Sequence, residues 1–255
     1  MAKLEAAMRD WGLVDPSEST RIAVISPHLD DAVLGCGALL ATHPGATVIT
    51  VFTGGPAQSC DPPTHWDAFA GFVAGDDVLG ARKREDAAAL AAVGATAVWL
   101  DHWEHQYLER PDWVGADAVV DSLEAAVRAS RPMMVLMPFG LANPDHDVTH
   151  QAAIEVRGRI PEVPWFCYED TGYKHIPGML AWRVAQLFRR GLWPTPAAIP
   201  TEGGRDAKAS AVACYGSQLL ALEADWQLGP KLAGSPEQFW RLAPPPSGWE
   251  GLSTD

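Results

Sequence analysis

Cysteine is scarce in this sequence: the 255 residues include four, and no two of them form a Cys-x-x-Cys pair. Cys36, Cys60, Cys167 and Cys214 lie far apart along the chain, so the sequence predicts neither a disulfide framework nor a zinc site built from thiolates. Residues 1–10 carry charged side chains and lack the apolar segment of a signal peptide. Together these absences predict a protein of the reducing cytoplasm.

The sequence also lacks an uninterrupted apolar run of about 18 residues, so no membrane-spanning helix is expected. Basic residues are few: 19 lysines and arginines stand against 32 acidic residues, for a formal net charge of -13. No basic run offsets this charge, which argues against nucleic acid or an anionic membrane as the main partner. A small molecule is therefore the expected partner, and the sequence leaves open whether the chain forms a homo-oligomer.

Short β-branched runs alternate with amphipathic stretches, which favours one large α/β domain over two small ones. The expected strands cover 22–25, 47–52, 97–100, 133–137 and 165–168. The expected helices cover 31–43, 76–93, 111–129, about 146 to 159, 178–190 and 205–224. A strand, helix, strand order demands parallel pairing with right-handed crossovers. The pattern therefore predicts a doubly wound, mostly parallel Rossmann-like sheet with helices on both faces.

One domain is expected to fill residues 1–255, with its core over about 21–225. The segments outside the regular elements are rich in Pro, Gly and Ser, which favour turns and loops. They comprise a short helix and connector over 1–20, a long loop over 54–75, a Pro-rich passage over 194–200, and an irregular C-terminal extension over 226–255.

Polar side chains gather where the expected strands end. The first strand is followed by His28, Asp30 and Asp31, and a second polar cluster over 143–146 follows the fourth strand. In open α/β sheets, ligands bind outside the carboxyl ends of the strands. These two loops are therefore the expected location of the functional site.

The two clusters hold the ligand types of a catalytic divalent metal, which usually has three protein ligands and one open position. His28 and Asp31 offer two ligands from one loop, and His146 offers a third from the other. If the two strands are neighbours in the sheet, the loops can converge. Asp30, adjacent to a ligand but free itself, would then serve as general base toward an activated water. This set predicts metal-assisted hydrolysis.

Each of these residues also has a plainer interpretation. Asp30 or Asp31 suits the cap of the helix that follows. His28 could be an ordinary loop histidine, and His146 a surface residue at the start of a helix. The joint occurrence of the two clusters after two strands favours the metal site.

The same residues carry a family resemblance. Residues 27–31, Pro-His-Leu-Asp-Asp, resemble the opening signature of the LmbE-like, or PIG-L-like, zinc-dependent N-acetylglucosaminyl deacetylases, usually Pro-His-Pro-Asp-Asp-Glu. Residues 144–146, Pro-Asp-His, are similar to their second signature, His-x-Asp-His. Within the helix expected over 76–93, Arg82-x-x-Glu85 and the Ala-rich turn up to Gly94 resemble the helix between those signatures. Stretches around 168–170 and 208–219 resemble bacterial members, so the similarity covers about residues 21 to 225.

The resemblance implies zinc bound by His28, Asp31 and His146, with Asp30 activating the metal-bound water. It also implies that Arg82 contacts the substrate, although a solvated salt bridge with a neighbouring acidic residue on its helix is an equal alternative. Glu104 and His105 fall where relatives place an acidic residue near the sugar hydroxyls. A plain loop role for this pair is as well supported.

Two positions depart from the family pattern. Ala32 replaces the glutamate that ends the first signature, and Asn143 replaces the first histidine of the second. The resemblance implies that this histidine stabilises the oxyanion or protonates the departing amine. Asparagine can donate a hydrogen bond to an oxyanion but cannot transfer a proton at neutral pH. Asp30 or His150, which is one helical turn beyond the predicted ligand, are the alternative acids.

The sequence therefore predicts a metal-dependent hydrolase that removes an N-acyl group, foremost N-acetyl, from an amino sugar or its conjugate. Asp30 and Asn143 are the expected catalytic residues, and Asp145 and His150 are expected to support the metal ligands. Zinc is the expected metal, and Fe2+ suits the same ligands. An amidase acting on a larger conjugate and a catalytically impaired metal- and sugar-binding module are the alternatives.

Overall fold

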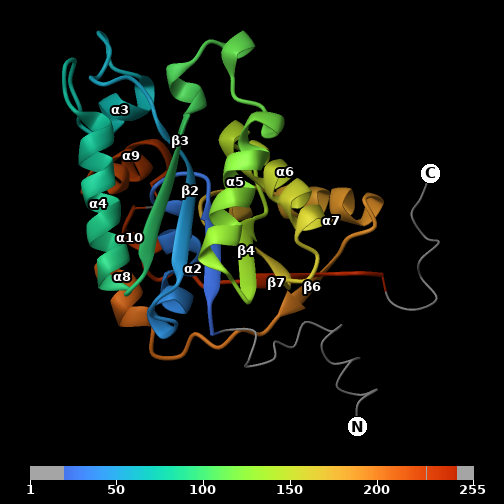
Figure 1. Ribbon diagram of the computed structural model, residues 1–255. Coiled ribbons are helices and arrows are strands. Elements are labelled where there is room, and N and C mark those ends of the chain that lie inside the picture. Colours follow the sequence, from blue (N-terminus) through green and yellow to red (C-terminus); the bar gives the residue numbers. More distant parts are fainter. Residues whose placement is uncertain (1–19, 228, 246–255) are drawn as a thin grey trace.

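The computed structural model describes residues 20–227 and 229–245, and its elements are drawn in Figure 1. In this part of the chain, seven strands form one sheet in the order β3-β2-β1-β4-β5-β7-β6. The strands are β1 (Ile22–Ser26), β2 (Thr47–Gly54), β3 (Thr96–Trp103), β4 (Met134–Pro138), β5 (Trp165–Tyr168), β6 (Trp193–Ala197) and β7 (Phe239–Ala243). The α-helices are α2 (Asp31–Thr42), α3 (His65–Phe69), α4 (Val78–Ala92), α5 (Ala116–Ser130), α6 (Pro144–Arg159), α7 (Met179–Arg189), α8 (Arg205–Val212), α9 (Gly216–Trp226) and α10 (Gly229–Leu232).

The first five strands pair in parallel, and β7 and β6 are added antiparallel at one side. The predicted doubly wound, mostly parallel sheet is therefore confirmed. The chain passes from β1 through α2 to β2 on one side, and later returns to place β4 on the other side of β1. Crossovers that leave in opposite directions open a crevice between β1 and β4, where the loops after both strands meet.

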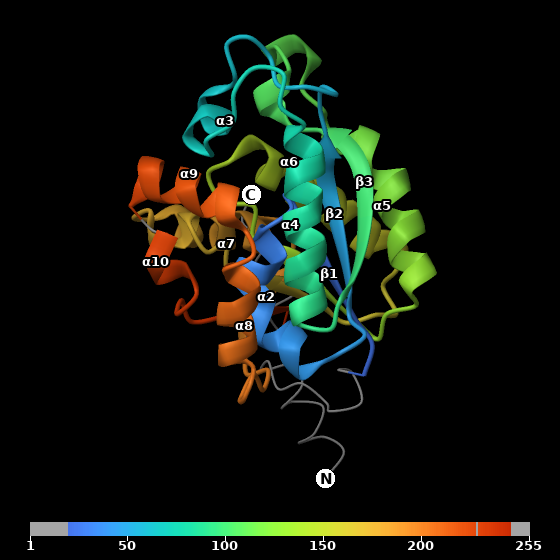
Figure 2. The ribbon, with the colours of Figure 1, turned by 90° about the vertical axis from the view of Figure 1, so that its left-hand side faces the viewer.

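Helices cover both faces of the sheet, because successive apolar side chains of β1 point to opposite faces and both sets are buried. Ile22 and Val24 pack into the core beneath α2, α4 and α8, whereas Ala23 and Ile25 face the core beneath α5, α6 and α7. Figure 2 looks onto the first of these layers. A strand that is apolar at every position is typical of a parallel sheet buried on both faces.

The end of the described chain differs from the prediction. Residues 226–255 were expected to be irregular, but β7 lies inside the sheet between β5 and β6. The Pro-rich passage over 194–200 likewise contains most of β6. Its prolines, Pro194 and Pro196, concealed the strand because proline cannot donate to a ladder. The two prolines are tolerated because β6 is the edge strand and pairs with a neighbour on one side only.

Three smaller differences concern loops and helix ends. The predicted loop over 54–75 contains α3, whose N-cap Thr64 accepts a hydrogen bond from the backbone N–H of Asp67 at 3.1 Å. The helix expected from Pro111 begins at Ala116, after a turn of 3-10 helix. The helix expected over 205–224 is divided into α8 and α9. The helix expected near the N-terminus, over 1–20, lies outside the described residues apart from its last position, and so do the last ten residues.

None of the helices in the described ranges is long and apolar enough to cross a membrane.

Candidate metal centre and active-site cavity

The loop after β1 is a tight turn tied together by one hydroxyl group. Ser26 Oγ donates to the carbonyl oxygen of His28 at 2.6 Å and accepts the backbone N–H of Ala32 at 2.9 Å. The backbone N–H of His28 donates to Asp31 Oδ2 at 3.0 Å. These bonds hold His28 and Asp31 together at the carboxyl end of β1. Ala32 is buried and does not line the cavity described below.

The loop after β4 places His146 in the first turn of α6. Gly140 has φ of +74°, and a Cβ at this position would lie 2.5 Å from the Cβ of His150 on α6. Only glycine combines this conformation with such a close approach. Asn143 then caps α6 by accepting the backbone N–H of Asp145 at 2.8 Å, and Pro144 occupies the first helical position. Both residue types are favoured there.

The three predicted ligands converge, since β1 and β4 are neighbours. One ligand atom from each of His28, Asp31 and His146 lies within 4.8 Å of the other two. Asp31 Oδ2 is 3.1 Å from His146 Nε2 and 3.3 Å from His28 Nδ1. Ligand atoms bound at about 2.0–2.1 Å in a tetrahedron lie roughly 3.3 Å apart, so the donor set fits one small divalent ion.

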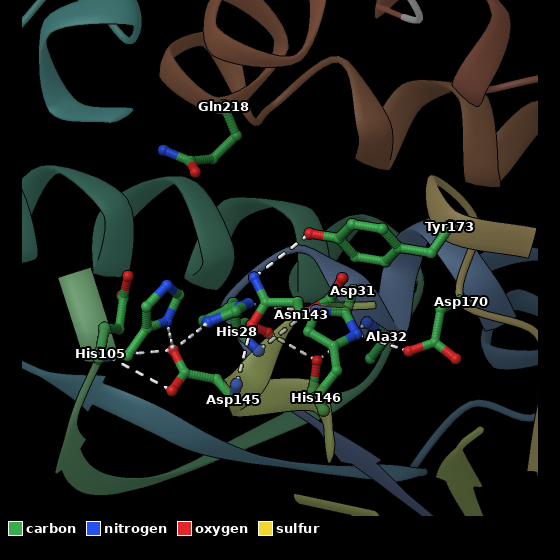
Figure 3. A network of polar contacts seen from close by, with 12 residues as sticks. His28, Asp31, Ala32, His105, Asn143, Asp145, His146, Asp170, Tyr173 and Gln218 are labelled. Atoms are coloured by element: carbon green, nitrogen blue, oxygen red, sulfur yellow. Dashed lines mark hydrogen bonds and ion pairs between the residues drawn. The ribbon is translucent and has the colours of Figure 1, made fainter. Parts of the chain in front are cut away.

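A buried carboxylate stands behind each histidine of the set (Figure 3). His28 Nε2 donates to Asp145 Oδ2 at 3.0 Å, and His146 Nδ1 donates to Asp170 Oδ1 at 2.5 Å. Each bond leaves the other ring nitrogen free to face an ion, which is the usual arrangement around histidine ligands. Asp170 also accepts the backbone N–H of Gly140 at 3.1 Å, which links the loops after β4 and β5.

Sequence reasoning proposed Asp145 for this supporting role and missed Asp170. The available signal was the position of Asp170 in the loop that follows the fifth predicted strand, where the carboxyl ends of the strands gather.

The charges of the set reinforce one another. Burial favours the neutral form of Asp31, but His146 and His28 outweigh it and lower the pKa of this carboxyl. Burial opposes protonation of His146, but Asp31 and Asp170 raise its pKa to about 9. A cation is therefore favoured between these carboxylates.

Asp30 is in a different environment from its neighbour. It occupies the N-cap position of α2, but its side chain makes no capping hydrogen bond, so the capping interpretation does not account for it. Burial, together with the charge of Asp31, raises the pKa of Asp30 to about 7. The side chain lines the cavity beside the donor set. A carboxyl group with this pKa can accept and return a proton near neutral pH.

The donor set opens into a cavity of about 350 Å³. This size is in the range of small-molecule sites. The wall combines polar and apolar side chains from the loops after β1, β3, β4 and β5 and from α2, α3, α4, α6, α9 and α10. They include Asp30, Arg82, Glu104, His105, Asn143, Tyr173, Gln218, Leu34, Trp66, Leu222 and Leu232.

Arg82 is buried, and Nη1 forms an ion pair with Glu104 Oε1 at 2.5 Å. The alternative of a solvated salt bridge on its own helix is therefore wrong. The neighbouring acids are engaged elsewhere: Glu85 accepts from the backbone and hydroxyl of Ser217, and Asp86 accepts from two aromatic side chains. Arg82 and Glu104 thus present a fixed charged pair at the cavity wall.

The remaining predicted residues separate into two groups. His105 and Asn143 line the cavity. His150 does not line it: the ring is buried beneath Gly140, and its Nδ1 donates to the carbonyl oxygen of Pro138 at 3.0 Å. Burial lowers the pKa of His150 to about 3, so its ring is neutral.

Tyr173 is a cavity residue that sequence reasoning missed. Its hydroxyl accepts Asn143 Nδ2 at 3.3 Å, and its ring packs edge-on against the His146 ring. It lies in a 3-10 turn after β5, so no helical or strand periodicity pointed to it.

Comparison with known proteins identifies the family. The model of the PIG-L family, described as GlcNAc-PI de-N-acetylase, matches residues 23–157, a span that contains all three members of the donor set. The chain belongs to the PIG-L family. The resemblance predicted from the two signatures is therefore confirmed. A search of the curated proteins found no match.

Solved structures of several deacetylases have a similar fold. A deacetylase of the A40926 pseudoaglycone is 26% identical, with a TM-score of 0.69 over 89% of this chain and 98% of that one. A triple mutant of a deacetylase of the teicoplanin biosynthetic pathway is 25% identical, with a TM-score of 0.72 over 89% and 100%. The N,N'-diacetylchitobiose deacetylase of Pyrococcus horikoshii, at 17% identity and a TM-score of 0.58 over 95% and 91%, shares the fold alone.

Proposed function

We propose that this PIG-L family member is a metal-dependent hydrolase that removes the N-acetyl group from an amino sugar carried on a larger conjugate. The observation that carries the proposal is the convergence of His28, Asp31 and His146 at the base of a cavity, with Asp30 buried beside them. The match to a family model described as a de-N-acetylase supports the choice of bond.

The donor set fits a divalent cation because each histidine turns one ring nitrogen to a buried carboxylate and the other toward Asp31. Two imidazoles and one carboxylate are typical of zinc, and iron accepts the same set. When bound, such a cation supplies a Lewis acid that polarises the acyl carbonyl and lowers the pKa of water.

The residues around the donor set have separate tasks. Asp30 accepts the proton of the attacking water, a role that its pKa of about 7 permits. Asn143 Nδ2, which donates to Tyr173 in the structure, can donate to the developing oxyanion instead. Arg82 and Glu104 offer a fixed donor and acceptor pair for sugar hydroxyls.

The cavity wall favours a conjugate over a free amino sugar. Leu34, Leu222 and Leu232 contribute apolar side chains, and Trp66 is anchored by a hydrogen bond from Nε1 to Gln218 Oε1 at 2.9 Å. An apolar group attached to the sugar would be buried against these side chains, with about 25 cal/mol per Å² of apolar area removed from water. The substrate named for one similar protein, the A40926 pseudoaglycone, is in line with this class.

Release of acetate from a panel of N-acetylglucosamine conjugates tests the proposal. The purified protein loaded with Zn2+ should release acetate, and the Asp30→Asn variant should retain its metal while its rate falls by about 10²–10⁴-fold. Asp117→Asn, which removes an exposed carboxylate on α5, is the matched control and should keep full activity.

The outcomes separate the alternatives. Metal binding by the parent protein without hydrolysis of any panel member would favour a binding module. Hydrolysis confined to larger acyl groups would favour an amidase. Full activity in Asp30→Asn would exclude this aspartate as the base.

A further inference from the structure

His105 is held in one orientation at the cavity wall. Its ring Nδ1 donates to Asp145 Oδ2 at 2.8 Å, and its backbone N–H lies 3.2 Å from the same oxygen. The ring packs edge-on against Trp113, whose Nε1 is fixed by the carbonyl oxygen of Leu108 at 3.1 Å. Three contacts thus fix a side chain that follows β3 and has no part in the donor set.

The same carboxylate oxygen holds both His105 and His28 (Figure 3). Asp145 therefore sets the position of His105 relative to the donor set. Since Nδ1 of His105 is bound to Asp145, the other ring nitrogen, Nε2, is the one available on the cavity side. With Nδ1–H bound to the carboxylate, Nε2 of the neutral ring is an acceptor, and Nε2 carries a proton to donate only in the imidazolium form, which the carboxylate behind the ring stabilises.

We propose that His105 is the acid that protonates the departing amine nitrogen, in place of Asn143, which cannot transfer a proton. The inference rests on the proposed function, because it assigns a further catalytic residue to that reaction.

Asp30 takes the proton of the attacking water, and several other ionisable groups on the cavity wall are less suited to protonating the amine. His28, Asp31 and His146 form the donor set, and Glu104 is bound to Arg82. Burial raises the pKa of the Tyr173 hydroxyl, which makes it a hydrogen-bond donor that retains its proton. Burial by itself would raise the pKa of Asp145, but the hydrogen bonds and charges of His105 and His28 outweigh it and lower the pKa of this carboxyl, so it stays ionised behind the histidine ring.

The proton balance of the step is complete. The attacking water gives one proton to Asp30, and its oxygen forms a bond to the acyl carbon. The C–N bond breaks as its electron pair takes the Nε2 proton of protonated His105, which gives the free amine and acetic acid. The second proton of the water is still on that acid and is lost to solvent as acetate forms. The side chain of His105 is 28% exposed, so solvent can return its proton, and the proton on Asp30 leaves to solvent.

Two leaving groups distinguish an acid from a binding residue. An amino-sugar amide needs protonation of its nitrogen before the bond breaks, whereas the weakly basic amine of 4-nitroacetanilide leaves with little help. His105→Gln can still hydrogen-bond to Asp145 but cannot transfer a proton. It should lose about 100-fold in kcat on the parent protein's best N-acetylglucosamine conjugate and less than about tenfold on 4-nitroacetanilide, with KM little changed.

The matched control is His102→Gln. His102 lies three residues earlier and pairs with Ser122 Oγ at 2.8 Å, and it does not line the cavity. This variant should keep the parent kinetics on both amides. Bound zinc per chain and the thermal midpoint should be unchanged in both variants, which tests for indirect damage to the donor set.

Three results would overturn the assignment. Equal losses on the two amides, or a loss confined to KM, would return His105 to substrate positioning, and unchanged kcat on both would remove it from the reaction. If the parent protein hydrolyses neither amide, the proposed function itself fails.

Discussion

Asp170→Asn perturbs the support of the metal ligand His146 without changing the volume of the side chain. Asp170 is 2% exposed and accepts two hydrogen bonds, from His146 Nδ1 at 2.5 Å and from the backbone N–H of Gly140 at 3.1 Å. Asparagine has one acceptor oxygen, so its amide group must face one of these two donors. We expect His146 to lose its fixed orientation and part of its basicity.

The expected loss is about 10- to 100-fold in metal affinity, which corresponds to roughly 1.4–2.7 kcal/mol. The metal-free variant should also be about 1–3 kcal/mol less stable, because a buried donor is left without a partner. Competition with a chromophoric chelator measures the zinc Kd, and urea unfolding followed by circular dichroism measures the stability. Both are performed on protein shown to be folded without metal.

Glu169→Gln is the control for this experiment. Glu169 is the adjacent residue, but it accepts Trp240 Nε1 at 3.0 Å and contacts no member of the donor set. Its substitution should leave the zinc Kd within twofold of the parent value. The reasoning is refuted if Asp170→Asn binds zinc as tightly as the parent protein, or if both variants lose affinity equally.

Three further predictions concern the cavity wall and the core. Arg82→Met should lower the free energy of unfolding by about 3–5 kcal/mol, because it leaves the charge of Glu104 buried without its ion-pair partner. A urea unfolding midpoint equal to the parent's would contradict this prediction. Burial raises the pKa of Asp86 to about 6, so the free energy of unfolding should fall by up to about 1.4 kcal/mol per pH unit as the pH rises from 4 to 6. The Asp86→Asn variant should lack the contribution of Asp86 to this pH dependence. A pH dependence equal to the parent's would exclude Asp86 as its source. Gly140→Ala should reduce both the free energy of unfolding and zinc binding, because the added Cβ meets the Cβ of His150. Gly178→Ala is the control: Gly178 has φ of +79° but no atom near the added Cβ, so this variant measures the backbone strain alone. Equal losses in the two variants would exclude the contact with His150 as the cause.

The parallel core of the fold could be predicted from local patterns. The five apolar runs that were expected as strands are β1 to β5. Nearly every residue of β1, β2, β4 and β5 is buried, and a strand buried on both faces is apolar along its length, whereas β3 at the edge is partly exposed. The antiparallel addition could not be predicted this way. The prolines of β6 argued against a strand, and only its place at the edge makes them acceptable. The short β7 falls within residues 226–255, which the sequence predicts to be an irregular C-terminal extension.

The candidate site was partly predictable for a related reason. His28, Asp31 and His146 combine metal-ligand chemistry with a position in the loop or the first helical turn that follows a strand, and both features can be read locally. Asp170 and Tyr173 have the same relation to β5, but neither belongs to a signature that indicates a ligand. The partner of Arg82 could not be predicted: helical spacing offered an acid on its own helix as one of two equal alternatives, and it says nothing of Glu104, which follows β3.

The sequence by itself determined which functional groups are available and that they lie at the carboxyl ends of the strands, because residue types and strand periodicity are local properties. The tertiary structure decided which of these groups meet. Only the adjacency of β1 and β4 brings the third ligand to the first two, and only the packing of the segments after β3, β4 and β5 places Asp170 behind His146 and His105 on Asp145. Such contacts depend on strand order and loop path, which no short stretch of sequence specifies.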